Sequence, residues 1–398
     1  MEMKVETRAS AAKQTVKSVT ILGSTGSVGR NTLDLVERSP ERFRVDVLTG
    51  NVNVDLLIEQ ARAFRPKLAV IGSEDKYAAL KQGLAGTGID VAAGRAAIAE
   101  AAAVPTDFVM ASIVGIAGLA PTLAAARRGA VVGLANKECL VCAGDFLLSE
   151  IERGGGELVP VDSEHNAIFQ VFDFHDDKSV EKLVLTASGG PFRSFDLARM
   201  ADVTPAQAVA HPNWDMGAKI SVDSATMMNK GLELIEAYYL FPVREDQIDI
   251  LVHPQSVVHS MVAYLDGSVL AQMGTQDMRI PISYALGWPN RMETPSRKLA
   301  LHEIGTLTFE APDQERFPAL RLAREALKAG GAAPVVLNAA NEVAVARFLS
   351  GGLKFLDIAR VVEGALNRSN AAAPSSIEDI GDIDQTARRL ALDIIGAA

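Results

Sequence analysis

The feature that most constrains the fold is a regular alternation of short apolar runs and helical stretches through the first 160 residues. Apolar runs of this kind are typical of parallel strands that are covered by helices on both faces of a sheet. The runs lie at residues 19–22, 45–48, 68–71, 108–114, 131–134 and 158–161. The helical stretches lie at 30–37, 55–64, 76–83, 121–128 and 145–153. The alternation predicts an α/β chain that begins with a doubly wound parallel sheet.

A different pattern follows this first part. Longer polar segments separate four expected strands, at 182–186, 248–252, 256–264 and 268–272, which indicates a central α+β catalytic domain. Helices are expected at 319–329, 334–350, 355–367 and 384–395, which would form a C-terminal helical bundle. The predicted division is a disordered tail at 1–17, a parallel-sheet domain at 18–161, a catalytic domain at 162–287, a linker at 288–313 and a helical domain at 314–398.

The composition excludes several classes of protein. The net charge of -10 disfavours a broad nucleic-acid surface, and an anionic substrate would therefore need local cations. No apolar segment resembling a secretory signal lies in the first 17 residues, and glycines and a proline interrupt the uncharged run at 108–126. Cys139 and Cys142 lack a second ligand cluster, so we interpret them as reduced thiols inside an apolar helix. Together these observations predict a cytoplasmic protein that does not enter a membrane.

A glycine-rich turn follows the first strand and opens a helix at about Arg30. Glycines at this place permit a tight turn and let backbone N–H groups approach a pyrophosphate at the helix N-terminus. Neighbouring hydroxyls could add donors, so the sequence predicts a bound dinucleotide. The candidate contacts are Gly23, Ser24, Thr25, Gly26, Ser27, Val28 and Gly29.

The end of the second strand bears on which dinucleotide is bound. A carboxylate there would bind the ribose 2′-hydroxyl of NAD. This strand instead ends at Gly50 and Asn51, and Asp46 lies inside it. NADP is therefore favoured, with Arg30 as a candidate partner of the 2′-phosphate and Asn53 as a further cofactor contact.

Three carboxylates suggest a cation site. Asp162 and Glu164 are two residues apart at the expected end of a strand, where alternation would put both on one face. Glu233 lies on a helical run with Asn229 four residues and Lys230 three residues before it. Oxygen ligands without a histidine or cysteine set suit Mg²⁺ or Mn²⁺. Glu236 is an alternative third ligand, and solvated surface acids are the plainer interpretation.

Donors for a phosphate lie in two segments near these acids. Ser188 belongs to a Ser-Gly-Gly turn that could form an anion-binding nest. Ser224, Asn229 and Lys230 offer hydroxyl, amide and ammonium donors. The sequence therefore predicts a phosphorylated substrate beside the cation.

Five further residues each allow more than one interpretation. The long segment 192–216 carries His211 and Trp214 and has the character of an active-site lid, with a hydrophobic loop packed in a groove as the alternative for Trp214. Lys137 follows a strand end of the first domain, where a catalytic lysine or an ordinary surface lysine could stand. We interpret His253 and His259 as structural.

Eight motifs together are similar to those of the 1-deoxy-D-xylulose 5-phosphate reductoisomerase family, from about residue 19 to the C-terminus. They are Gly-Ser-Thr-Gly-Ser-Val-Gly (23–29), Leu-Ala-Asn-Lys-Glu (134–138), Pro-Val-Asp-Ser-Glu-His (160–165), Ala-Ser-Gly-Gly-Pro-Phe (187–192), His-Pro-Asn-Trp-Asp-Met-Gly (211–217), Asn-Lys-Gly-Leu-Glu (229–233), His-Pro-Gln-Ser (253–256) and Leu-Asn-Ala-Ala-Asn-Glu (337–342). The resemblance implies a Rossmann-like first domain and an enzyme of non-mevalonate isoprenoid biosynthesis. Such an enzyme rearranges 1-deoxy-D-xylulose 5-phosphate, by a retro-aldol or an α-ketol route, and reduces the product with NADPH to 2-C-methyl-D-erythritol 4-phosphate.

The resemblance also implies roles for particular residues. The metal ligands would be Asp162, Glu164 and Glu233, and the catalytic residues Lys137, Glu164, Glu233 and His211. The phosphorylated ketose would be held by Ser163, Glu164, Ser188, His211, Trp214, Ser224, Asn229, Lys230 and Glu233. Further cofactor contacts would be Asn136, Glu138 and Gly217. It implies a homodimer, formed through the central domain, and inhibition by fosmidomycin, a phosphonate that carries a hydroxamate. Asn51 stands where some members have lysine, so the 2′-phosphate contact is open.

Two alternatives have different requirements. A semialdehyde-dehydrogenase-like oxidoreductase shares the spacing of the glycine turn but needs a catalytic cysteine, for which Cys139 or Cys142 would be the candidate. A non-enzymatic nucleotide sensor would not need a cation site beside a phosphate site. Neither alternative explains the three carboxylates.

Overall fold

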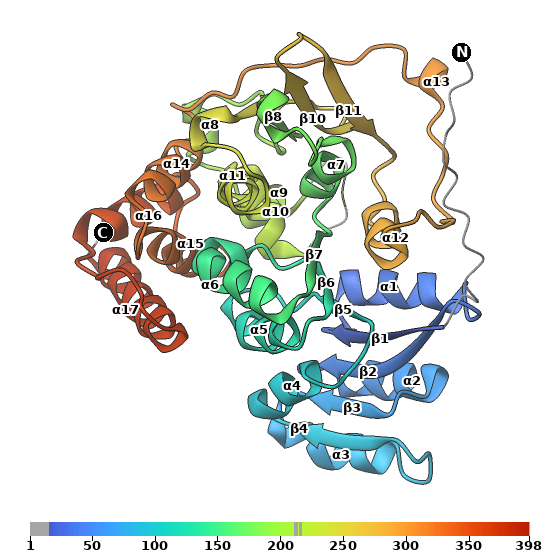
Figure 1. Cartoon of the computed structure of the whole chain (residues 1–398). Helices are drawn as coiled ribbons and strands as arrows, with labels where there is room; N and C mark the ends of the chain where they lie inside the picture. The colour runs from blue at the N-terminus through green and yellow to red at the C-terminus, as the bar shows by residue number, and fades with distance from the viewer. Residues whose placement is uncertain (1–15, 211–213, 215–216, 398) are drawn as a thin grey trace, which may run out of the picture.

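The structure is a computed structural model that describes residues 16–210, 214 and 217–397. The predicted fold class is confirmed, because a parallel sheet with helices is followed by a second sheet and by C-terminal helices. In Figure 1 these parts run from blue through green and yellow to red. No helix in the described part of the chain is both long and apolar enough to cross a bilayer.

The first sheet has seven parallel strands in the order β4-β3-β2-β1-β5-β6-β7. The strands are β1 (Lys17–Leu22), β2 (Phe43–Gly50), β3 (Leu68–Ile71), β4 (Asp90–Ala93), β5 (Phe108–Ala111), β6 (Val131–Leu134) and β7 (Glu157–Pro160). Their helices are α1 (Ser27–Glu37), α2 (Val54–Phe64), α3 (Tyr77–Gly83), α4 (Arg95–Ala102), α5 (Leu119–Arg127) and α6 (Glu138–Gly154), with short 3₁₀ helices η1 (Glu74–Lys76) and η2 (Ile116–Gly118). The strand order reverses between β1 and β5, and ligands bind at such a switch point in open α/β sheets.

Some predicted elements of this part were wrong in extent. Strand β4 and helix α4 were not predicted, because β4 is short and only half-buried and its apolar signal is weak. Strand β5 ends at Ala111, not at residue 114, since the Asn136 side chain donates to the carbonyls of Ile113 and Gly115 and turns the chain out of the sheet. Helix α6 begins at Glu138, well before the expected residue 145.

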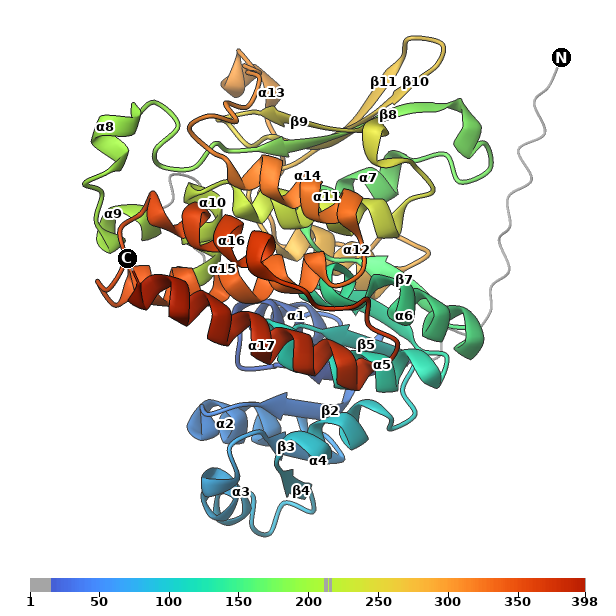
Figure 2. The ribbon, with the colours of Figure 1, turned by 90° about the vertical axis from the view of Figure 1, so that its left-hand side faces the viewer.

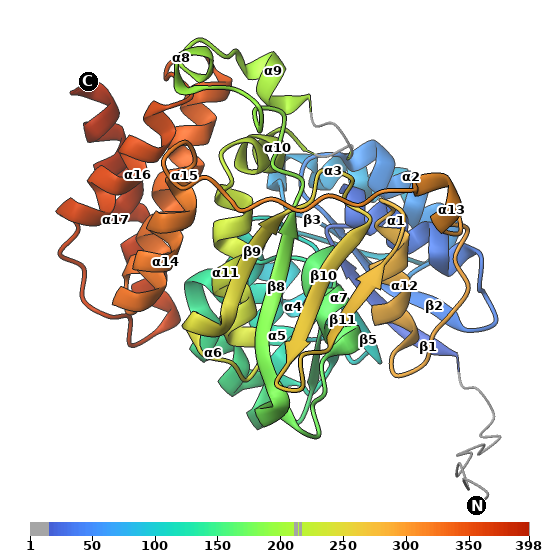
Figure 3. The same cartoon turned by 90° about the horizontal axis from the view of Figure 1, so that it is seen from above.

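The second sheet has the order β11-β10-β8-β9, with β8 parallel to β9 and the other pairs antiparallel. Its strands are β8 (Val180–Ala187), β9 (Ile248–Val252), β10 (Val258–Tyr264) and β11 (Val269–Met273). The helices of this part are α7 (Ser163–Val171), α8 (Leu197–Met200), α9 (Pro205–Val209), α10 (Ala218–Ala225), α11 (Met228–Leu240) and α12 (Arg279–Gly287), with η3 (Asp177–Ser179) and η4 (Glu245–Gln247). Helix α7 contacts β7 of the first sheet and β10 and β11 of the second, so it joins the two sheets (Figure 3).

The C-terminal part is helical, as predicted. It comprises α14 (Ala319–Ala329), α15 (Ala333–Leu349), α16 (Asp357–Arg368) and α17 (Ile377–Gly396). The short helix α13 (Leu301–Ile304) precedes it, inside the segment 288–313 that was predicted as a linker. Helix α17 begins earlier than expected, because Ser376 caps it with a hydrogen bond from the Asp379 amide. Figure 2 shows α14 to α17 covering one side of the molecule, where α14 contacts α11 and α15 contacts α6 and α10. One apolar core runs from β5 and β6 through α11 to these helices, so the bundle supports the helices that carry the candidate site.

Candidate metal and phosphate site

The carboxyl ends of four neighbouring strands bring the candidate residues together. Gly23 follows β1, Ser112 follows β5, Lys137 follows β6 and Asp162 follows β7. Because all these strands are parallel, their ends meet at one edge of the sheet. The dinucleotide turn and the carboxylates therefore share one edge, which the sequence pattern alone did not establish.

The glycine turn has the geometry that its spacing predicted. Gly23 has a φ of +86°, which favours glycine, and a Cβ there would lie 3.0 Å from the Ser112 carbonyl oxygen. A Cβ on Gly29 would lie 2.4 Å from the Gly23 carbonyl oxygen, so only glycine lets α1 begin this close to the turn. Helix α1 starts at Ser27 instead of about Arg30. Its N-terminal amides thus lie directly at the turn, where a pyrophosphate is favoured.

One hydroxyl of this turn has a hydrogen-bond partner within the protein. Ser24 is fully buried, and its Oγ donates to Gln60 Oε1 at 2.7 Å while Gln60 Nε2 donates to the Ser24 carbonyl oxygen at 3.0 Å. The sequence predicts the Ser24 hydroxyl as a donor to phosphate. In the structure this hydroxyl donates to Gln60 instead, and the pair of hydrogen bonds connects the turn to α2. Thr25 and Ser27 are at least partly exposed and remain as the hydroxyls of the turn that can meet a ligand.

Three other predicted cofactor contacts have structural partners. Asn53 caps α2 by accepting from the Leu56 amide at 3.2 Å. Asn136 is buried and holds the loop after β5, with its Nδ2 2.9 Å from the Gly115 carbonyl oxygen and its Oδ1 accepting from the Cys139 amide. Glu138 lies 3.3 Å from the Lys219 ammonium.

The remaining predicted cofactor positions lie at element ends. Gly50 and Asn51 stand at the carboxyl end of β2, where Asn51 is exposed. Val28 is partly exposed in the first turn of α1, and Gly217 is the N-cap of α10. These positions are compatible with a dinucleotide that lies along the carboxyl edge of the sheet.

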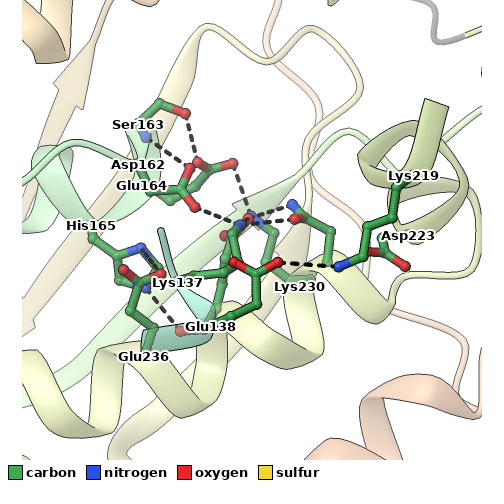
Figure 4. Close-up of polar contacts among 12 residues, drawn as sticks. Lys137, Glu138, Asp162, Ser163, Glu164, His165, Lys219, Asp223, Lys230 and Glu236 are labelled. Atoms are coloured by element: carbon green, nitrogen blue, oxygen red, sulfur yellow. Dashed lines mark hydrogen bonds and ion pairs between the residues drawn. The ribbon is translucent and has the colours of Figure 1, made fainter. Parts of the chain in front are cut away.

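The three carboxylates converge. Oxygens of Asp162, Glu164 and Glu233 all lie within 4.8 Å of one another. Our reason for pairing Asp162 with Glu164 was wrong, however, because β7 ends at Pro160 and alternation along a strand does not apply. Asp162 instead caps α7, accepting from the Ser163 amide at 3.1 Å, and Glu164 lies in the first turn of that helix. Glu233 reaches the same place from α11, and Figure 4 shows Asp162 and Glu164 at the start of α7.

Two ammonium groups lie among the carboxylates. Lys137 Nζ is 2.5 Å from Asp162 Oδ2 and 3.3 Å from Glu233 Oε1. Lys230 Nζ is 2.9 Å from Glu164 Oε1 and also pairs with Glu233. Three buried or half-buried carboxylates therefore face two cations, which leaves an excess of negative charge. An all-oxygen donor set with this excess fits a divalent hard cation.

The protonation behaviour of the cluster follows from these contacts. Burial opposes ionisation of Glu164, but Lys230 and the Ser163 hydroxyl, which donates to it at 2.6 Å, outweigh burial and lower its pKa. Burial and the neighbouring Glu164 charge raise the pKa of Glu233 to about 7. Burial alone would lower the pKa of Lys137, but Asp162 and Glu233 raise it well above its usual value. Lys137 is therefore held as an ammonium group among these carboxylates.

Glu236, the alternative third ligand, faces a different group. It is fully buried one turn after Glu233, and its Oε2 lies 3.2 Å from Nδ1 of His165 without the alignment of a hydrogen bond. His165 Nε2 lies 2.8 Å from the Glu233 carbonyl oxygen. Asp162, His165 and Glu236 also form a group of metal-ligand type, but it contains a ring nitrogen and excludes Glu164. The oxygen-only set suits Mg²⁺ better.

The phosphate candidates lie on adjoining loops and helices. Gly190 has a φ of +67°, and a Cβ there would lie 2.8 Å from the Ser224 carbonyl oxygen, so the Ser188–Gly190 turn packs directly against the end of α10. Ser188 Oγ accepts from the Gly190 amide at 3.2 Å. Asn229 lies in the first turn of α11, where its Oδ1 accepts from Lys137 at 2.8 Å. The Asn229 amide and the Lys137 and Lys230 ammonium groups thus contact the carboxylates, and the Ser188–Gly190 turn lies against the end of α10.

The lid candidates are only partly described. His211 and most of the segment around it lie outside the described residues, whereas Trp214 lies 6.2 Å from the His259 ring between centroids. His259 is buried beneath it, and burial lowers its pKa. We had interpreted His259 as structural from its spacing alone, and only the packing of β10 shows its place beside Trp214. His253 does have structural partners, with Nδ1 2.8 Å from the Thr308 carbonyl oxygen.

The two cysteines are buried free thiols, as predicted. Burial raises the pKa of Cys139 to about 12, and burial also raises the pKa of Cys142. Neither thiol ionises near neutral pH, and a nucleophilic cysteine needs the thiolate. The semialdehyde-dehydrogenase-like alternative is therefore not favoured.

The fold and the site define an oxidoreductase that uses a dinucleotide and a divalent cation. Three family models match the chain: 1-deoxy-D-xylulose 5-phosphate reductoisomerase over residues 19–144, its C-terminal domain over 158–241, and the DXP reductoisomerase C-terminal domain over 273–390. The chain belongs to the 1-deoxy-D-xylulose 5-phosphate reductoisomerase family.

Similar proteins with that name cover the whole chain. The sequence is 59% identical to the 1-deoxy-D-xylulose 5-phosphate reductoisomerase of Rhodospirillum centenum, over 100% of this chain and 99% of the relative. It is 56% identical to that of Caulobacter vibrioides, over 95% and 96% of the two chains. The solved structure of the Zymomonas mobilis enzyme in complex with NADPH matches with a TM-score of 0.92 at 53% identity, over 96% of this chain and 100% of that one.

A second solved structure carries the other expected ligands. It is a DOX-P reductoisomerase in complex with NADPH, fosmidomycin and magnesium, with a TM-score of 0.92 at 42% identity, over 96% of this chain and 98% of that one. An NADPH-dependent reductoisomerase is therefore the activity that the family assigns to this chain.

Proposed function

We propose that this chain converts 1-deoxy-D-xylulose 5-phosphate to 2-C-methyl-D-erythritol 4-phosphate with NADPH, in non-mevalonate isoprenoid biosynthesis. The observation that carries the proposal is the convergence of Asp162, Glu164 and Glu233 within 4.8 Å, beside two ammonium groups and at the carboxyl edge of a dinucleotide-type sheet. Family membership and the NADPH and magnesium complexes of similar structures support it.

The carboxylates of Asp162, Glu164 and Glu233 would hold Mg²⁺ or Mn²⁺. When bound, the cation would polarise the substrate carbonyl and NADPH would supply the hydride. The Ser163 hydroxyl donates to Glu164 and fixes the direction of its carboxylate. Lys137 stays protonated between Asp162 and Glu233, so it can stabilise negative charge on the reacting oxygens.

The substrate phosphate would be bound by Ser188, Ser224, Asn229 and Lys230, with His211 nearby. The packing of the Ser188–Gly190 turn against α10 places two of these hydroxyl-bearing segments side by side. Trp214, which lies beside His259, would cover the substrate and exclude water. The same donors would hold the phosphonate of fosmidomycin, and the carboxylate-bound cation its hydroxamate.

The test is oxidation of NADPH, followed by absorbance, with 1-deoxy-D-xylulose 5-phosphate and either Mg²⁺ or Mn²⁺. We expect turnover that stops when EDTA removes the cation, because the carboxylates alone cannot polarise the carbonyl. NADPH oxidation that continues in EDTA would refute the metal site. Folded protein that binds NADPH but does not oxidise it under any of these conditions would favour the sensor alternative.

Cofactor choice gives a further prediction. Asn51 lies exposed at the carboxyl end of β2, where NAD-dependent sheets of this type carry an acid. In Asn51→Asp, a carboxylate would repel the 2′-phosphate, so we expect the NADPH-to-NADH ratio of kcat/KM to fall at least about tenfold. Steady-state kinetics with both cofactors measures this ratio. An unchanged ratio would place 2′-phosphate recognition elsewhere, with Arg30 as the next residue to test.

We also propose a homodimer that assembles through the second sheet. Strand β11 is at the edge of this sheet and has no strand partner on its outer side among the described residues. Val269 and Leu270 on this strand are each at least half exposed. Open, apolar edge strands pair readily with another chain, and a second copy is the occupant that the resemblance implies.

The oligomeric state tests this interface. Light scattering coupled to size-exclusion chromatography should give twice the mass of the chain for the wild type. Leu270→Lys should give a monomer or a strongly concentration-dependent mass, because a charge on the edge strand disfavours pairing. A dimer of undiminished stability in Leu270→Lys would place the interface elsewhere, and a monomeric wild type would refute the dimer.

The domain division at residues 18–161, 162–287, 288–313 and 314–398 and a cytoplasmic location stay proposals. The two buried free thiols support a reducing compartment.

A further inference from the structure

The Leu-Asn-Ala-Ala-Asn-Glu motif at residues 337–342 has no place in the site described above. It lies on α15, in the C-terminal helical part, and its two asparagines are fully buried. Asn338 Nδ2 donates to Glu342 Oε1 at 3.3 Å, so one asparagine acts within the helix. The other, Asn341, reaches out of α15 to α10.

The contact of Asn341 fixes a buried acid. Its Nδ2 donates to Asp223 Oδ1 at 2.8 Å, and Asp223 has a side chain only 1% exposed. The opposite orientation of the amide would place Asn341 Oδ1 against a carboxylate oxygen, so the amide can face Asp223 only with its nitrogen. The motif therefore supplies a hydrogen-bond donor to α10.

The second oxygen of Asp223 continues the chain of contacts. Asp223 Oδ2 lies 2.9 Å from Lys219 Nζ, and the same ammonium lies 3.3 Å from Glu138 Oε1 (Figure 4). Burial would lower the pKa of Lys219, but Asp223 and Glu138 outweigh it and raise the pKa. Lys219 is therefore charged and bridges two acids from different parts of the chain.

The contacts of Lys219 with Asp223 and Glu138 lie close to candidate binding residues. Helix α10 follows the segment that carries Trp214 and bears Ser224, a candidate phosphate donor, in its last turn. Glu138 is the neighbour of Lys137 in the sequence and opens α6, next to the cofactor edge of the sheet. The contacts from Asn341 to Asp223, from Asp223 to Lys219 and from Lys219 to Glu138 thus link α15, α10 and α6 around the helix that carries Ser224.

We propose that Lys219 and Asn341 are positioning residues that hold α10 in the orientation in which Ser224 meets the phosphorylated substrate. The proposal rests on the proposed function, since it assigns a substrate phosphate to Ser224. Neither residue touches substrate in this scheme, and both act through Asp223. Loss of either should weaken substrate binding more than it slows the chemical step.

The experiment compares Lys219→Met with Lys219→Arg and with Lys182→Met. Lys182 forms a surface pair with Asp249 at 2.7 Å on the second sheet, so its variant loses an ion-paired lysine away from the site. We expect Lys219→Met to raise KM for 1-deoxy-D-xylulose 5-phosphate at least about tenfold, because the coupling free energy between contacting charges is typically of this size. We expect kcat to change less than about threefold. Lys219→Arg should restore most of the loss, and Lys182→Met should behave as wild type.

A second variant and a binding measurement make the test decisive. Asn341→Asp sets two carboxylates against each other without a change of size, so it should reproduce the rise in KM. Fosmidomycin binding with Mg²⁺, measured by calorimetry, should weaken by a similar factor in both variants. Folded variants with unchanged KM and unchanged fosmidomycin affinity would overturn the proposal, as would a loss confined to kcat. A wild-type protein that binds fosmidomycin but does not turn over would refute the proposed function and leave the binding comparison valid.

Discussion

Glu233→Gln should abolish turnover while NADPH binding stays almost unchanged. The substitution keeps the size and polarity of the side chain but removes one of three charges that would hold the cation. A Lewis-acid cation contributes several kcal/mol to the stabilisation of the transition state, so we expect kcat to fall about 10³-fold. The dinucleotide turn lies on β1 and α1, whereas Glu233 lies on α11, so the NADPH dissociation constant should change less than about twofold.

The matched control for Glu233→Gln is Glu236→Gln. Glu236 is equally buried one helical turn away but faces His165 instead of Glu164. We expect Glu236→Gln to lose much less activity, because its carboxylate is outside the oxygen-only ligand set. A larger loss in Glu236→Gln than in Glu233→Gln would make Asp162, His165 and Glu236 the metal ligands. A loss of NADPH binding in Glu233→Gln would refute the expectation that the first domain binds NADPH independently of the cation ligand on α11.

The thermal midpoint separates a catalytic effect from a folding defect. Glu233 is fully buried beside Glu164, and this environment disfavours its charged form. The glutamine side chain still offers an oxygen to the Lys137 and Lys230 ammonium groups that pair with Glu233, so the thermal midpoint should fall little in the absence of a divalent cation. A midpoint several degrees below that of the wild type would mean that the loss of activity reports instability of the fold.

Local sequence patterns were sufficient to predict most of the strands and helices of the fold. Strands β3, β6 and β9 and helix α14 lie where the apolar runs and periodicity placed them. The parts that were missed depended on tertiary contacts. Strand β4 carries little apolar signal, and the end of β5 is set by hydrogen bonds from Asn136, which lies more than twenty residues further along the chain.

The site shows the same division between local and distant information. Residue types predicted Asp162, Glu164 and Glu233 as candidate cation ligands, and the three carboxylates do converge. The local reason for the prediction was wrong, because α7 begins where a strand was expected to continue. The inward orientation of Ser24 and the place of His259 beside Trp214 depend on packing that no local pattern encodes. The bridge from Asn341 to Glu138 joins residues about 200 positions apart and could be found only in the folded chain.

Lys230→Met should have opposite effects on the two ligands of the site. In this structure the Lys230 ammonium pairs with Glu164 and Glu233, two of the three carboxylates that would hold the cation. Lys230 is also a candidate donor to the substrate phosphate. A bound divalent cation would satisfy the carboxylates and leave the ammonium free to meet the phosphate. Lys230 therefore competes with the cation for the carboxylates but helps to bind the substrate phosphate.

We expect Lys230→Met to bind Mn²⁺ more tightly than the wild type does and to raise KM for 1-deoxy-D-xylulose 5-phosphate about 10–150-fold, the effect of a lost hydrogen bond to a charged group. Calorimetric titration with Mn²⁺ and steady-state kinetics measure the two quantities on the same preparation. Lys182→Met, which removes a paired surface lysine, should change neither. If Mn²⁺ bound more weakly to Lys230→Met, the ammonium would be organising the carboxylates instead of competing for them. If KM were unchanged, the phosphate would have to be bound by Ser188, Ser224 and Asn229 without Lys230.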